Sequence, residues 1–170
     1  MLIIGIDNGT TGSITALDVA MDTSVSIALS INMPVKEELD YTKEAKHITR
    51  VVLDGLVHEL RELITSHDTL NIRAVIERPM INPGRFKQSI LAARAFEATI
   101  IALELLGIAY RVVDSRVWQK ALLPSGLKGI ELKKAAVQFV HKTFPKLDRS
   151  KDQDGRADSV CLAYYGVRHL

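Results

Sequence analysis

The sequence predicts an α/β fold: a mixed five-stranded sheet, made of a three-strand antiparallel meander plus two parallel strands, with helices on both faces. Three observations lead to this prediction. The apolar run at residues 2–7 predicts a short buried strand that ends in Asp7. Two more strand patterns follow closely, at residues 13–19 and 24–32, which favours a meander. Further along, helical spacing alternates with short apolar runs, a pattern typical of βα units.

The first half of the chain contains the meander and one helix. Gly9 and Gly12 suit a tight turn between the first two strands, and residues 24–32 alternate apolar and polar side chains. We expect a loop at residues 33–41. Residues 43–66 are predicted to form an amphipathic helix, because apolar residues recur there at steps of three and four: Ile48, Val52, Leu56, Leu60 and Leu63.

The second half alternates strands and helices. A strand at residues 71–77 follows a helix, so we expect it to run parallel to the first strand and to bring Glu77 to the same sheet edge as Asp7. A loop rich in Pro and Gly follows at residues 78–87. The remaining predicted elements are a helix at 88–106, a strand at 109–113, and helices at 115–122, 130–142 and 155–168. This order is that of the ribonuclease H-like fold, and 170 residues suit a single domain spanning residues 1–170.

Composition narrows the class of protein. The chain is 47% hydrophobic and 25% charged, as in an ordinary globular protein. No apolar run approaches the roughly 20 residues of a membrane span, and the N-terminus lacks the pattern of a signal peptide, so we expect a cytoplasmic protein, in the host cytoplasm if it is phage-encoded. Cys161 is the only cysteine, which excludes an intrachain disulfide and favours a packed thiol.

Charge is spread unevenly around a net value of +2. Residues 1–70 carry 5 basic and 11 acidic side chains, a balance of −6, whereas residues 111–170 carry 12 and 6, a balance of +6. A basic half is typical of a protein that binds a polyanion. A solvated surface with chance asymmetry is the alternative.

Acids stand at the ends of three predicted elements. Asp7 and Glu77 end the two parallel strands, and Asp154 and Asp158 lie one turn apart where the last helix opens, with Asp152 as a spare candidate. A buried carboxylate needs a compensating charge, and Mg²⁺ prefers carboxylate oxygens. Two such ions supply an activated water and stabilise the leaving oxygen in phosphodiester cleavage. Taken singly, each acid could instead end a strand, pair with a cation such as Arg78, or favour a helix N-terminus.

Three short motifs resemble those of the RuvC-type Holliday-junction resolvases of bacteria and phages. They are Ile6-Asp7-Asn8-Gly9, Ile76-Glu77 and Arg156-Ala157-Asp158-Ser159, in matching order and spacing. The resemblance implies a homodimeric, Mg²⁺-dependent endodeoxyribonuclease that cuts four-way DNA junctions by paired nicks. It also implies that Asp7, Glu77, Asp154 and Asp158 are the catalytic acids and hold two Mg²⁺ ions, with Mn²⁺ as a possible substitute.

One position departs from the family pattern. The family carries an acid or histidine three residues before the final aspartate, where this chain has Gly155. Asp154 is the nearest replacement as the fourth ligand, and Asp152 and His141 are the alternatives.

The resemblance also predicts residues that contact DNA. Arg85, Phe86 and Lys87 lie in the loop after the second acid, and Lys120 and Lys134, with Lys133 as a nearby alternative to the latter, fall where the family has basic residues near the scissile phosphate. Phe86 could instead pack into the core, and the lysines could be solvated. The helix at 88–106 is apolar on more than one face, which favours a homodimer interface over complete burial within the monomer.

Three other functions compete with this interpretation. The segment from Gly5 to Gly12 also resembles the phosphate loop of sugar kinases and actin-like ATPases, although these are much longer. A non-catalytic adaptor for branched DNA is the second alternative, and a related nuclease acting on RNA or flaps is the third.

Overall fold

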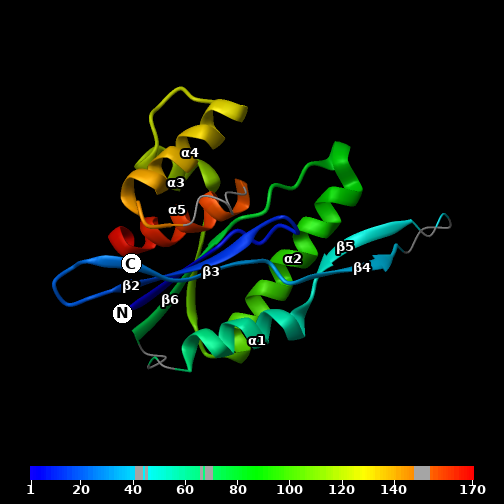
Figure 1. Ribbon diagram of the computed structural model, residues 1–170. Helices are drawn as coiled ribbons and strands as arrows, with labels where there is room; N and C mark the ends of the chain where they lie inside the picture. Colours follow the sequence, from blue (N-terminus) through cyan, green and yellow to red (C-terminus); the bar gives the residue numbers. More distant parts are fainter. Residues whose placement is uncertain (41–43, 45, 66, 68–70, 148–153) are drawn as a thin grey trace.

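A five-stranded sheet forms the centre of the molecule (Figure 1). The computed structural model describes residues 1–40, 44, 46–65, 67, 71–147 and 154–170, apart from the side chain of Asp154. The strands are β1 (Leu2–Ile6), β2 (Ser13–Val19), β3 (Val25–Asn32), β6 (Ile72–Glu77) and β7 (Ala109–Val113), in the spatial order β3-β2-β1-β6-β7.

Strand directions match the prediction. β1 pairs antiparallel with β2, which pairs antiparallel with β3, whereas β1, β6 and β7 run parallel to one another. Ile6 lies opposite Ile76 across the parallel pair. Consequently Asp7 and Glu77, the next residues along, emerge together at one edge of the sheet.

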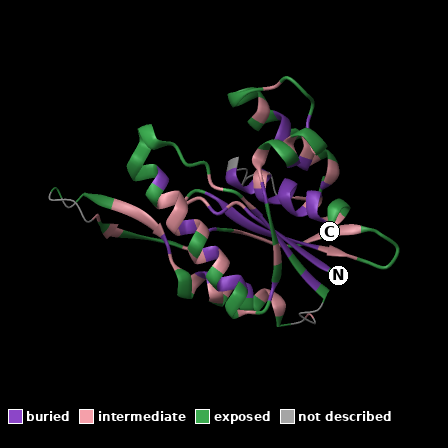
Figure 2. Ribbon diagram, turned by 180° about the vertical axis from the view of Figure 1, so that it is seen from behind, coloured by how far each residue is buried: buried purple, intermediate pink, exposed green. Residues whose placement is uncertain are grey.

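Helices cover both faces of the sheet (Figure 1), as expected. α1 (Leu53–Ile64) and α2 (Phe86–Leu105) pack on one face, and α3 (Ser115–Leu122), α4 (Gly129–Thr143) and α5 (Asp154–His169) pack on the other. Side chains of β1 alternate between the two cores, with Ile4 facing α1 and α2 and Ile3 facing α5. Figure 2 shows the resulting buried centre. None of the helices in the described part has the length and apolar character needed to cross a membrane.

The predicted loop at 33–41 and the N-terminal part of the predicted helix at 43–66 are wrong. A two-stranded hairpin of β4 (Val35–Leu39) and β5 (His47–Val51) occupies this part of the chain, and α1 begins only at Leu53. The β-branched residues of β5 favour a strand, while Ile48 and Val52 continue the four-residue spacing of α1 by coincidence. Residues 41–43 and 45 lie outside the described part.

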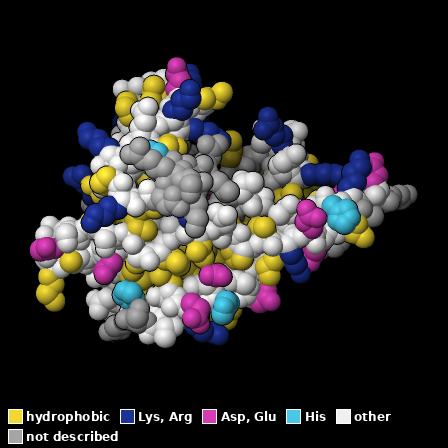
Figure 3. Space-filling view, viewed as in Figure 1, with side chains coloured by type: hydrophobic (Ala, Val, Ile, Leu, Met, Phe, Trp, Pro, Cys, Tyr) yellow, Lys and Arg dark blue, Asp and Glu magenta, His cyan; other side chains and the backbone are white. Residues whose placement is uncertain are grey.

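Two halves of the molecule differ in charge on the face shown in Figure 3. Figure 3 shows Lys and Arg side chains gathered over the half formed by α3 and α4, and acidic side chains over the half that contains α1. The uneven charge of the sequence is therefore also uneven in space.

Candidate active site

Two carboxylates meet where the parallel strands end. Asp7 follows β1 and Glu77 is the last residue of β6, and both line one cleft of about 330 Å³. The side-chain amide of Asn8 donates to the backbone oxygen of Glu77 at 2.9 Å, which ties the two strand ends together. The sequence-predicted meeting of Asp7 and Glu77 is thus observed.

Glu77 lies in an environment that opposes its negative charge. Burial raises its pKa to about 7, and the charges of Asp7 and Asp114 add to this rise. The indole N–H of Trp118 donates to Glu77 Oε2 at 2.9 Å and acts in the opposite direction. Trp118 is buried on α3, so this donor reaches the site from the core beneath it.

Asp7 is also held in an unfavourable environment for a charge. Burial raises its pKa, while the backbone N–H of Gly9, which donates to Oδ1 at 3.3 Å, and the charge of Lys133 lower it. Lys133 comes from α4, and it lines a surface groove together with the predicted Lys134. The nearby alternative to Lys134 is therefore the lysine whose charge acts on Asp7.

A row of buried hydroxyls fixes α5 against the sheet. Ser13 and Thr15 of β2 both hydrogen-bond to Ser159 of α5, at 2.6 and 2.7 Å, and Ser13 donates to the backbone oxygen of Gly155 at 2.7 Å. Gly5 allows β1 and α5 to come close together, since a side-chain carbon at this position would lie 2.1 Å from the backbone oxygen of Ser159. The start of α5 is therefore placed by β1 and β2, next to Asp7.

The structure explains the glycine at the position where the family has an acid or histidine. A Cβ on Gly155 would lie 2.5 Å from the backbone oxygen of Thr11 and 3.3 Å from Asp7 Oδ2. There is no room for a ligand side chain at this residue, although its backbone adjoins the carboxylate. The neighbouring Asp154 begins α5, but its side chain lies outside the described part, as does all of Asp152.

The other acid of α5 is half-buried. Asp158 lies on the first turns of the helix. Burial of the Cys161 thiol raises its pKa, and the negative charge of Asp158 adds to this rise. Cys161 is fully buried, as the packed-thiol prediction requires.

The donor set suits a hard divalent cation. Asp7 and Glu77 are carboxylates that repel each other in a partly buried cleft, and a divalent cation between such groups would relieve both the repulsion and the cost of burial. Among the side chains that the structure describes, no group of three Asp, Glu, His or Cys residues is placed to hold a metal ion. Asp7 and Glu77 are therefore the two predicted ligands that the described part of the structure brings together, and Asp158, although described, does not complete a group of three with them.

The loop after Glu77 borders the same cleft. Arg78 pairs with Asp114, the N-cap of α3, and at the other end Ser89 exchanges hydrogen bonds with the backbone of Asn82 at 2.8 and 2.9 Å. The short 3-10 helix η2 (Pro83–Arg85) lies between Asn82 and Ser89. This anchoring leaves Met80 and Ile81 exposed at the tip of the loop.

The predicted DNA-contacting residues lie in different places. Arg85 lines the cleft with the acids, whereas Phe86 and Lys87 border a separate groove between the start of α2 and β5. Phe86 is 71% exposed, so it does not pack into the core. Lys120 is exposed on α3, and His141 lies in the last turn of α4.

Sequence reasoning missed three contributors to the site: Asn8, Asp114 and Trp118. Asp114 carried a usable signal, because an Asp just before a helix is a preferred N-cap. Trp118 carried none, since its contact with Glu77 joins residues 41 positions apart.

The fold and the paired strand-end acids define a ribonuclease H-like α/β protein. Among solved structures, the chain is similar to RuvC of Thermus thermophilus, both in complex with a Holliday junction substrate (TM-score 0.70, 15% identity, 97% of this chain and 92% of that one) and alone (TM-score 0.62, 13% identity, with the same coverage). It is also similar to the yeast mitochondrial Holliday junction resolvase Ydc2, with TM-score 0.57, 12% identity and coverage of 98% and 77%. At these identities the likeness shows the fold, and it confirms the predicted resemblance to RuvC-type resolvases at that level. No protein-family model matches the chain, and no curated protein matches it in sequence.

Proposed function

We propose that this protein is a divalent-metal-dependent endodeoxyribonuclease that resolves four-way DNA junctions by paired nicks, acting as a homodimer in the cytoplasm. The observation that carries the proposal is the pair Asp7 and Glu77, whose negative charges repel each other in the cleft bordered by the loop after β6. The solved structures with this fold include a RuvC in complex with a Holliday junction substrate, which supports the choice of branched DNA.

The acids would hold the metal. Asp7 and Glu77 are the ligands with described geometry, and Asp154 and Asp158 are the proposed ligands from α5. When bound, Mg²⁺ or Mn²⁺ supplies an activated water and positive charge for the leaving oxygen, in a two-ion arrangement. Trp118 orients Glu77 through its hydrogen bond, and Asn8 holds the two strand ends at a fixed separation.

Basic and apolar residues around the cleft would bind the DNA. Arg85 lines the cleft with the acids, which supports a contact with a phosphate there. Lys133 or Lys134 from α4 and Lys120 from α3 would extend the positive charge. Met80 and Ile81 present apolar side chains from an anchored loop, which suits contact with unstacked bases at a junction centre. The predicted contacts of Phe86 and Lys87 with DNA stay predictions.

The test is cleavage of labelled four-way junction, linear duplex and flap DNA, with Mg²⁺ and with EDTA. We expect paired nicks in the junction alone, lost with EDTA and in Asp7→Asn. The Asp7→Asn protein should still bind the junction, as tightly or more so, because the substitution removes a charge that repels phosphate. Asp18→Asn is the matched control: it lies at the opposite end of the β1–β2 pair and should cleave normally.

Other outcomes would redirect the assignment. Cleavage of flaps or RNA in preference to junctions would indicate a related nuclease. Absence of cleavage with both Mg²⁺ and Mn²⁺ would contradict the proposal, and junction binding or ATP binding would then decide between an adaptor and a phosphate-loop protein.

A further inference from the structure

Arg156 is a buried cation at the start of α5. It is only 8% exposed, although arginine is rarely buried in folded proteins unless it is paired. Its Nη2 donates to the backbone oxygen of Ser30 in β3 at 2.8 Å. Among the described residues, its buried Nε has no hydrogen-bond partner, and no carboxylate forms an ion pair with the guanidinium. Burying such a charge costs free energy, so the stability of the fold does not account for this arginine.

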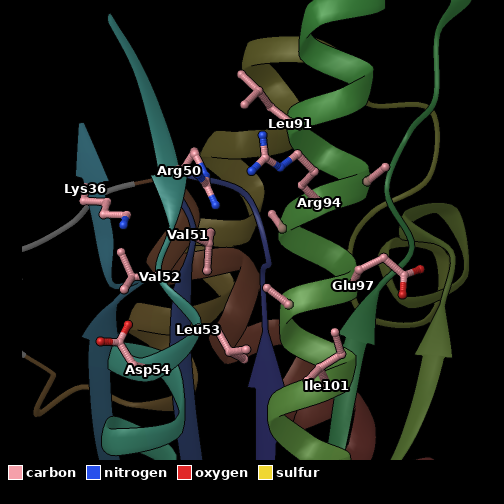
Figure 4. Close-up of a pocket in the computed structure, with 13 residues that line it drawn as sticks. Lys36, Arg50, Val51, Val52, Leu53, Asp54, Leu91, Arg94, Glu97 and Ile101 are labelled. Carbon is pink, nitrogen blue, oxygen red and sulfur yellow. The ribbon is translucent and has the colours of Figure 1, made fainter. Parts of the chain in front are cut away.

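Arg50 provides a comparison within the same chain. It points into a groove of about 530 Å³ between α2 and the β4–β5 hairpin (Figure 4). It pairs with Glu38, and both side chains are 27% exposed. A carboxylate and water therefore compensate the charge of Arg50, whereas the described surroundings of Arg156 offer it one backbone oxygen.

The contacts of Arg156 close a ring between the helix and the sheet. Ser30, whose backbone oxygen binds the guanidinium, lies opposite Thr15 in the β2–β3 ladder, and the two hydroxyls are 3.0 Å apart. Thr15 is hydrogen-bonded in turn to Ser159, whose hydroxyl lies 3.0 Å from the backbone oxygen of Arg156. This ring begins and ends on Arg156, and it joins one turn of α5 to both β2 and β3.

The ring adjoins the candidate metal site. Gly155 precedes Arg156, and a carbon added to this glycine would lie 3.3 Å from Asp7 Oδ2. A rotation of the first turn of α5 would therefore move the backbone at Gly155 relative to the Asp7 carboxylate. The same rotation would redirect the proposed ligand Asp158, two residues beyond Arg156. A side chain that holds this turn against β3 thus acts on the site through the helix.

The position of Arg156 excludes a direct part in binding metal or phosphate. Its side chain reaches β3, whereas Glu77 ends β6, which lies beyond β2 and β1 in the sheet. At 100° per residue, Arg156 and Asp158 lie about 200° apart around α5, so the cation and the proposed ligand are on opposite sides of the helix. A buried guanidinium is also out of reach of a DNA backbone on the surface.

We propose that Arg156 is a positioning residue for the metal site. Its guanidinium holds the first turn of α5 against β3, so that the Gly155 backbone and the proposed ligand Asp158 keep one position relative to Asp7. The inference rests on the proposed function, and it adds to that function a determinant that touches neither metal nor DNA. Groups that orient metal ligands from outside typically change metal affinity about 10- to 100-fold when they are substituted.

The test compares Mn²⁺ binding, measured by calorimetry, with the Tm of the metal-free protein in EDTA. Arg156→Met removes the guanidinium and its bond to Ser30 but keeps a long side chain in the same space. We expect the affinity for Mn²⁺ to fall about tenfold or more. The metal-free Tm should stay the same or rise, because a buried charge has been removed. A lower metal-free Tm, with or without weaker Mn²⁺ binding, would overturn the proposal and assign Arg156 to packing.

Three further variants sharpen the comparison. Arg156→Lys can still donate to the Ser30 oxygen and should recover part of the affinity. Ser30→Ala opens the ring on β3, outside α5, and should weaken Mn²⁺ binding about threefold, as expected for one lost hydrogen bond. Unchanged affinity in both Arg156→Met and Ser30→Ala would overturn the proposal. Arg168→Met, the same change at the exposed end of α5, is the control and should alter neither affinity nor Tm.

Binding of DNA without metal separates positioning from a phosphate contact. In EDTA, Arg156→Met protein should bind the four-way junction as the wild type does, because the side chain is buried. Weaker junction binding under these conditions would overturn the proposal in favour of a direct contact. Wild-type protein that binds no Mn²⁺ would overturn the metal site itself, whereas a wild type and an Arg156→Met variant that bind Mn²⁺ equally would overturn the role of Arg156 alone.

Discussion

At the scale of single residues, the unfavourable charge of Glu77 is the main property of the site. Its pKa is raised to about 7 by burial and by Asp7 and Asp114, whereas an unfolded chain would titrate near 4.5. Between these values the folded protein binds a proton that the unfolded chain releases, so stability falls as the pH rises through this window. The cost is fully present above about pH 7, where a metal ion would offset it.

This sign leads to the first prediction. Without metal, Glu77→Gln should raise the free energy of unfolding above neutral pH by about 1 kcal/mol, which corresponds to about 3 °C in Tm. This is less than the full pKa shift of Glu77 would give, because the cleft is open to solvent and the charge is partly screened. At about pH 5 the gain should vanish. Mg²⁺ should raise the Tm of the wild type more at about pH 8 than at about pH 5, and should not do so in the variant. Thermal melts across pH measure this, with Glu62→Gln as the surface control; a gain that persists at low pH would contradict the electrostatic account.

The second prediction concerns the hydrogen bond beneath Glu77. Trp118→Phe keeps an aromatic ring in the core but removes the donor that lowers the pKa of Glu77. We expect a loss of about 2 kcal/mol in stability and a shift of the acidic limb of the pH–cleavage profile to higher pH. Denaturant unfolding and the pH profile measure the two effects. Val117→Ala, on the exposed side of the same helix, should change neither; loss of stability without a shifted profile would indicate a packing role alone.

These residue-level features were only partly predictable. The apolar runs before Asp7 and Glu77 predicted two acids at neighbouring strand ends, because the direction of a βα connection follows from local pattern. Trp118 and Asn8 could not be found in the same way, since their contacts depend on how distant segments pack.

At the scale of elements, close backbone contact determines what the start of α5 can contribute. In most helices a Gly→Ala change is stabilising by up to about 1 kcal/mol. At Gly155 we predict the opposite, a loss of about 1–3 kcal/mol, because the new carbon would overlap the Thr11 oxygen and displace the helix. Gly9→Ala is the matched control, since its added carbon would be 3.6 Å from Asp7 Oδ1, an ordinary contact. Equal tolerance of both changes, measured by thermal melting, would show that α5 shifts without cost.

The β4–β5 hairpin shows where element prediction from sequence fails. Ile48 and Val52 fit the helical period of α1, and no Pro or Gly separates them from it. Periodicity alone therefore joined two different elements. The β-branched content of residues 48–51 was the competing signal, and it decided the outcome because this segment pairs with β4.

At the scale of the whole molecule, the layered fold was largely predictable from the sequence. The alternation of strands and helices specified the five-stranded sheet and its parallel strands, and the apolar excess of residues 88–106 indicated a further partner.

The buried hydroxyls of Ser13, Thr15 and Ser159 have a consequence for how such a site can change over time. Hydrogen bonds of this kind can be made at one rotation of α5 about its axis only, so these three side chains determine which residues of the helix face the sheet. A substitution on the first turns of α5 outside this hydrogen-bond network therefore leaves the orientation of the helix unchanged. A change of that orientation requires substitutions in β2 and α5 together, so we expect the three hydroxyls to vary as a set.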